Sequence, residues 1–209
     1  MKLPQIRFEG KDLLGKLILP SGKLRISKDR VRQIDKKILR CCKAWKRYEY
    51  RILKGICEIL DLKFDHSVID VIVDPCWPEG ESSPIIVSSK LPADQFIDVL
   101  THELLHALFH NNRKKLNTDK IWDVMFPTAW PRLTKIHVLV HAAHQYIMID
   151  VLKDSRRITR EIKTMRNHPD YRTSWEYVQK EGYLKIIARF KKFYRLKGYR
   201  FSRYPNPRL

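Results

Sequence analysis

Apolar residues recur every three or four positions across residues 28–60, a spacing that predicts one long amphipathic helix starting after a suitable N-cap at Ser27. The apolar positions are Val31, Ile34, Ile38, Cys41, Trp45, Tyr48, Ile52, Ile56 and Ile59. Such a helix packs within its own chain or pairs with a second subunit as a coiled coil. Because only one apolar seam is visible, packing within the chain is favoured.

Short apolar runs bounded by turn residues predict strands elsewhere. Residues 68–73 and 84–89 fit single strands, the second lying just before a helical pattern. Residues 17–19 and 24–26 flank the turn at 20–23 and predict a small hairpin.

The remaining pattern is helical. Residues 93–110 contain no helix breaker, with Pro92 and Asp94 suited to the first turn. Residues 133–153 predict a second long helix, after a loop that holds two prolines.

Three shorter helices are expected downstream, over 155–167, 173–180 and 183–196, with a break at 168–170 and a terminal arm at 198–209. The sequence therefore predicts an α+β fold that is mostly helical, with a short β-sheet flanked by long amphipathic helices. Its expected segments are an N-terminal hairpin and basic helix (1–60), a core (61–155) and a basic helical extension (156–209).

One pentapeptide in the 93–110 helix is the strongest chemical signal, His102-Glu103-Leu104-Leu105-His106. Two imidazoles four residues apart share one helix face and can bind one metal ion, while the glutamate between them handles protons. Composition alone predicts about 0.01 such pentapeptides in a chain of this kind. At 100° per residue, His102 and His106 lie opposite the apolar stripe of the helix, beside Asp98, which is placed to accept a hydrogen bond from His102.

This motif and the order of strand, short strand and motif helix resemble the zincin metallopeptidases. The resemblance covers roughly residues 65–155 and implies a small zincin-like core, a bound Zn²⁺, His102 and His106 as ligands and Glu103 as general base. It also implies that Ile85–Ser88 is an edge strand that pairs with an extended peptide substrate.

A catalytic zinc needs a third protein ligand from elsewhere in the chain. His110 is about 12 Å along the axis from His102, too far for two ligands of one ion. The metzincin pattern also fails, since Phe109 and Asn112 occupy its glycine and third-histidine positions.

The best source of the third ligand is the helix at 133–153, where His137, His141 and His144 share one face. We predict His141, the central one, and leave His137 and His144 as alternatives. A ligand from a downstream helix is the gluzincin arrangement, but this helix carries no glutamate, so the chain is nearer to zincins with three histidine ligands, such as SprT-like proteases. The neighbouring histidines or Tyr146 would then orient ligands or stabilise an oxyanion.

Charge is large and unevenly placed. The chain of 209 residues carries a net charge of +19, while residues 61–152 hold 8 basic and 12 acidic side chains. Basic flanks suit a polyanionic partner, with nucleic acid the leading candidate. In the last 21 residues, basic and aromatic side chains alternate, which fits either base stacking or, more favourably, an amphipathic helix that docks its aromatic face.

Two functions follow. The first is a zinc-dependent peptidase that hydrolyses peptide or protein substrates; the alternative is a basic nucleic-acid-binding or structural protein that retains a non-catalytic zincin fold. Four cysteines without a paired framework predict a reducing compartment, and the adjacent Cys41 and Cys42, inside a helical pattern, are predicted to be core thiols. With no apolar run long enough for a signal peptide or a membrane span, the expected location is cytoplasmic, without a membrane partner. The sequence does not fix the oligomeric state.

Overall fold

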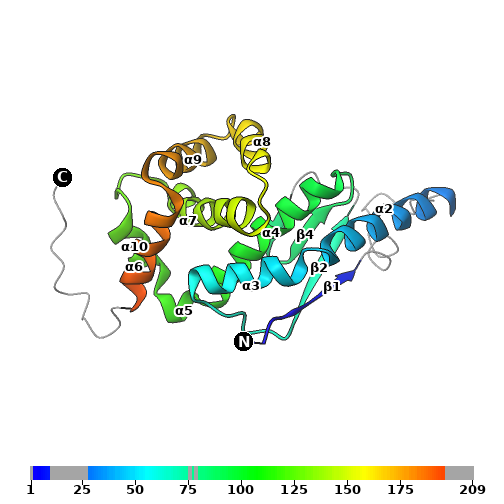
Figure 1. The fold of residues 1–209 in the computed structure, drawn as a ribbon, viewed down its shortest axis with the longest axis horizontal. Coiled ribbons are helices and arrows are strands. Elements are labelled where there is room, and N and C mark those ends of the chain that lie inside the picture. Colours follow the sequence, from blue (N-terminus) through cyan, green and yellow to red (C-terminus); the bar gives the residue numbers. More distant parts are fainter. Residues whose placement is uncertain (1, 10–27, 75–76, 78–79, 196–209) are drawn as a thin grey trace, which may run out of the picture. The chain divides into compact units, whose positions relative to one another are not determined.

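The structure is a computed structural model that describes residues 2–9, 28–74, 77 and 80–195. It is mostly helical with a small four-stranded sheet, which confirms the predicted α+β class (Figure 1). The described residues form two compact units, one from residues 1–54 and 64–107 and the other from 55–63 and 108–209. The predicted hairpin at 17–26 and the terminal arm at 198–209 lie outside the described residues.

The first unit is built on the sheet. Its strands are β1 (Gln5–Glu9), β2 (Val68–Asp74), β3 (Gly80–Ser82) and β4 (Ile85–Ser88), in the order β1-β2-β4-β3. β1 and β4 each pair with β2 in parallel, and β3 pairs with β4 antiparallel. The alternation of polar and apolar residues in β1 matches a half-buried strand.

The expectation that Ile85–Ser88 forms an edge strand is wrong. β4 lies between β2 and β3, with Ile72 opposite Ile86 on one side and Glu81 opposite Ile86 on the other. The three residues of β3 contain no apolar side chain, so no hydrophobic pattern marks them as a strand. β3 therefore forms this edge of the sheet.

The predicted helix over 28–60 is two helices, α2 (Lys28–Lys46) and α3 (Glu49–Leu60). The chain turns at residues 47–48, where the Tyr48 amide donates to the Trp45 carbonyl at 2.8 Å, a spacing of three residues instead of four. After the turn, the Glu49 carboxylate accepts the backbone N–H of Ile6 in β1 at 3.2 Å. A contact to a distant strand thus favours the break, which the apolar spacing does not reveal.

Helix α4 (Ala93–Asn111) carries the histidine motif, and its apolar stripe completes the core of the first unit. Phe96, Leu100 and Leu104 are fully buried, and the Phe96 ring lies 6.2 Å from that of Phe8 in β1. The strands supply Val71 and Val87, also fully buried. The polar side of α4, which carries His102 and His106, therefore lies opposite the apolar stripe that packs in the core.

The described residues of the second unit are helical apart from short connections. They comprise the ends of α3 and α4, then α5 (Arg113–Leu116), α6 (Thr118–Met125), α7 (Arg132–Tyr146), the π-helix η1 (Ile147–Val151), α8 (Arg156–Met165), α9 (Pro169–Glu181) and α10 (Tyr183–Arg195). α7 packs against α9 and α10. Pro169 starts α9 instead of separating two elements, because proline suits the first helical turn.

Two aromatic side chains of α10 dock as the favoured interpretation predicts. Phe190 is fully buried, with its ring stacked 6.4 Å from Trp122, and the Tyr194 hydroxyl donates to the Asp61 carbonyl at 2.9 Å. These two rings are therefore core residues. Tyr199, Phe201 and Tyr204 lie outside the described residues. Among the described residues, no helix has the length and apolar character to cross a membrane.

Candidate metal centre

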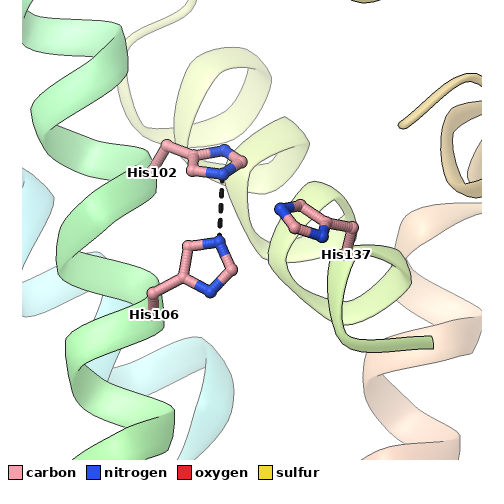
Figure 2. Close-up of side chains that lie close together, drawn as sticks. All are labelled: His102, His106 and His137. Carbon is pink, nitrogen blue, oxygen red and sulfur yellow. Dashed lines mark hydrogen bonds between the residues drawn. The ribbon is translucent and has the colours of Figure 1, made fainter. Parts of the chain in front are cut away.

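The two histidines of the motif lie side by side on α4. Their Nε2 atoms are 3.1 Å apart, with the ring centroids 4.8 Å apart and the ring planes inclined by 60° (Figure 2). Two nitrogens bound tetrahedrally to one zinc ion at about 2.0–2.1 Å would be about 3.3 Å apart. The observed separation is close to that value, so the pair fits two ligands of one metal ion.

Glu103 lies between these histidines in the sequence and is buried, with 8% of its surface exposed. It lies against β3, because a Cβ atom at Gly80 would be 2.5 Å from Glu103 Oε1. Asp98 is also buried, one turn before His102. The bond from His102 to Asp98 remains a prediction.

The three histidines predicted to share a helix face all lie on α7, and all are buried. His137 projects from this helix in Figure 2. Each of the three uses its Nδ1 atom for a contact within the second unit. The partners are the Leu133 carbonyl for His137 at 2.9 Å, the Ser174 hydroxyl for His141 at 2.8 Å and Glu161 Oε1 for His144 at 3.1 Å.

The contact of His141 with Ser174 fixes the tautomer of the histidine. The Ser174 hydroxyl donates its single proton to the Tyr171 carbonyl at 2.8 Å, so its oxygen accepts from His141 Nδ1. The neutral ring then carries its lone pair on Nε2, the form that a metal ligand requires. Trp175 stacks on the same ring, 4.2 Å between centroids at 9°, and holds its plane.

His137 and His144 have the same polarity. A backbone carbonyl accepts only, so His137 donates from Nδ1 to Leu133, and in a neutral His144 the carboxylate of Glu161 imposes the same tautomer. Burial lowers the pKa of His137 below its ordinary value of 6.5, although the Leu133 hydrogen bond and the Asp170 charge act in the opposite direction. The lowered pKa favours the neutral ring, which is the form that binds a metal.

Sequence reasoning missed the residues that orient these rings. Ser174 and Trp175 lie on α9, and Glu161 lies on α8, between 17 and 34 positions from their histidine partners. A single serine or glutamate inside a predicted helix carries no signal of such a role. The helix periodicity would at most have placed them on one face of a helix.

The described residues include two sets of side chains with the donor atoms for a metal ion. One is His102, His106 and His137, and the other is His102, His141 and Glu161. His110, excluded as a ligand on spacing, belongs to neither set and is exposed near the end of α4.

Comparison of the chain with protein-family profiles, curated proteins and solved structures gives no match. The resemblance to zincins consequently rests on the residues of this chain alone.

Proposed function

We propose that this protein is a zinc-dependent metallopeptidase. The observation that carries the proposal is the pair of His102 and His106 Nε2 atoms 3.1 Å apart on one helix, with buried Glu103 between them in the sequence. Two adjacent imidazoles and a glutamate that is not a ligand are the donor set of a hydrolytic zinc site. No other buried group in the described first unit offers comparable chemistry.

The third ligand in this proposal is His141. Its Nδ1 proton is committed to Ser174, its ring is held by Trp175, and its side chain is fully buried. These are the contacts that orient a metal-binding imidazole. His137 is the first alternative, because burial lowers its pKa and its ring has the same tautomer, and Glu161 adds a carboxylate donor.

A bound zinc ion supplies a water of lowered pKa and polarises the carbonyl of the scissile bond. The chain supplies the rest of the chemistry. The Glu103 carboxylate accepts a proton from the attacking water and delivers it to the nitrogen of the leaving amine. Its burial against Gly80 limits its contact with bulk water and keeps it near its working position.

The substrate in this proposal is an extended peptide bound along β3. Among the described residues, β3 pairs only with β4 and ends the sheet on this side, so its outer edge offers backbone groups for strand addition. Gly80 at the start of β3 brings this edge to Glu103. We therefore assign to Gly80–Ser82 the pairing with substrate that the resemblance implied for Ile85–Ser88.

The test compares the native chain with Glu103→Gln, which keeps the shape of the side chain and removes the base. Elemental analysis measures metal content, and a fluorogenic peptide library measures cleavage. We expect equal zinc in both proteins and a rate about 10²- to 10⁴-fold lower in the variant. Glu176→Gln, an exposed glutamate of α9, is the matched control and keeps full activity.

The alternative function is a basic binding or structural protein with an inert metal site, and the net charge of +19 favours it. The same measurements separate the two. Zinc bound by the native chain without cleavage of any peptide would establish the alternative. A native chain that binds no zinc would overturn both.

A further inference from the structure

The exposed side of α2 carries an open groove of about 550 Å³ in the first unit. Four cationic side chains line it, namely Lys36, Arg40, Lys43 and Arg47. Lys36, Arg40 and Lys43, spaced by four and three residues, lie on one face of α2 over about 10 Å at 1.5 Å per residue, and Arg47 follows the end of the helix at Lys46. The groove is therefore a continuous row of positive charge.

Among the described residues, this row has no counterions. Within residues 2–9, 28–74, 77 and 80–195, no ion pair involves any of its four side chains, and all four are exposed. Lys46 on the same helix differs, because Glu49 neutralises it at 2.5 Å. Four cations this close repel one another, so an anion that binds them all relieves the repulsion.

An anionic membrane is a poor partner for this face. A membrane-surface helix buries a broad apolar face in the lipid, whereas the apolar face of α2 is already used inside the unit, with Cys41 2% exposed and Trp45 fully buried. Of the described residues that line the groove, only Leu39 has a large apolar side chain, and it is 59% exposed. A rigid, regularly charged polymer suits the row better.

We propose that the groove of α2 binds double-stranded nucleic acid through its phosphate backbone. Its remaining lining in the described part of the chain, Leu39, Ala44 and Ala93, contains no aromatic side chain. Sites for single strands stack bases on aromatic rings, so this lining argues for backbone contact with a duplex. The small Ala44 and Ala93 let a phosphate approach the cations. This inference does not depend on the proposed peptidase activity.

The proposal predicts how strongly the binding affinity depends on salt concentration. Each phosphate contact to duplex DNA contributes about −0.9 to the slope of log K against log salt. Four contacts give a slope of about −3.6, so the groove accounts for an affinity loss of about 150-fold between 50 and 200 mM salt. With two of the four contacts removed, the remaining two should account for an affinity loss of about 12-fold over the same salt range.

The experiment uses the full chain and a labelled 24-base-pair duplex DNA of mixed sequence, with binding measured by fluorescence anisotropy over a salt series. Arg40→Gln/Lys43→Gln removes two groove cations. Lys37→Gln/Lys180→Gln is the control, because it removes the same charge from exposed sites outside the groove. Circular dichroism confirms that both variants fold.

We expect the groove variant to bind more weakly, with a slope shallower by about 1.8, and the control to keep the native slope. Equal slopes in the two variants would overturn the proposal, as would a native chain that does not bind the duplex. Single-stranded DNA of the same sequence and vesicles containing phosphatidylserine are the competing probes. Tighter binding to either of them would also overturn it.

Discussion

Gly80 of β3 lies directly against Glu103 of α4. A Cβ atom at position 80 would stand 2.5 Å from Glu103 Oε1 and 2.6 Å from Val99 Cγ1, closer than real Cβ atoms come to any neighbour. The edge strand and the motif helix therefore meet at a residue without a side chain. This close approach ties the position of the proposed base to the backbone of the sheet.

Gly80→Ala should displace the Glu103 carboxylate, because the flexible carboxyl end yields more easily than the backbone of β3. A displacement of about 1 Å in a catalytic group costs about 100-fold in rate. We expect kcat/KM for a fluorogenic peptide to fall by about that factor while zinc content stays unchanged. Ser82→Ala, in the same strand, is the control. Full activity in Gly80→Ala would show that this contact does not position Glu103.

Replacing the histidines of α7 one at a time identifies the third ligand. His141→Ala should abolish zinc binding, because two imidazoles alone do not make a catalytic zinc site. His137→Ala and His144→Ala should retain the metal and lose only part of the activity. Elemental analysis after dialysis gives the answer, and zinc lost from His137→Ala but kept by His141→Ala would make His137 the ligand.

Ser174→Ala removes the hydroxyl oxygen that accepts a hydrogen bond from His141 Nδ1. The substitution leaves every imidazole side chain of the site in place. Loss of such an orienting hydrogen bond weakens metal binding about 10- to 100-fold. Competition with a chelator measures the zinc affinity. Thr164→Ala, which removes a comparable hydroxyl-to-carbonyl bond from α8, serves as the control. Unchanged zinc affinity in Ser174→Ala, with only a lower melting temperature, would give Ser174 a purely structural role.

The thiol of Cys42 should be unreactive at neutral pH. Burial, and next the neighbouring Cys41, raises the pKa of Cys42 from 9.0 to about 11. Since only the thiolate reacts, at pH 8 alkylation should be about 100-fold slower than for an ordinary thiol. The rate should rise about tenfold per pH unit between pH 8 and pH 10.

Mass spectrometry of the peptide that contains Cys42 measures this alkylation by iodoacetamide. The same chain in urea is the reference, because unfolding removes the burial. Fast labelling of the folded chain at pH 8 would contradict the structural role predicted for the adjacent cysteines.

Apolar spacing located the main helices and two of the strands because burial on one face leaves a period in the sequence. The helices at 93–111 and 132–146 follow from that rule, as do the neighbouring pair His102 and His106 and the shared face of His137, His141 and His144. The break between α2 and α3 does not follow from it. The Glu49 carboxylate there accepts a hydrogen bond from a strand amide 43 positions away, and the local spacing of apolar residues does not indicate that contact.

The edge strand shows the same limit. Gly80–Ser82 lacks apolar residues because it lies at a border of the sheet, so only backbone pairing defines it as a strand. The expectation for Ile85–Ser88 failed for the complementary reason, since its apolar run reflects burial between two neighbours.

By itself the sequence determined that His102 and His106 share one face of the motif helix, because spacing along one helix is a local property of 3.6 residues per turn. It also determined the α+β class and the uneven placement of charge. Only the tertiary structure decided that Ser174 and Glu161 hold the imidazoles of α7 and that Gly80 lies against Glu103. These relationships join residues on separate elements, and packing alone brings such residues together.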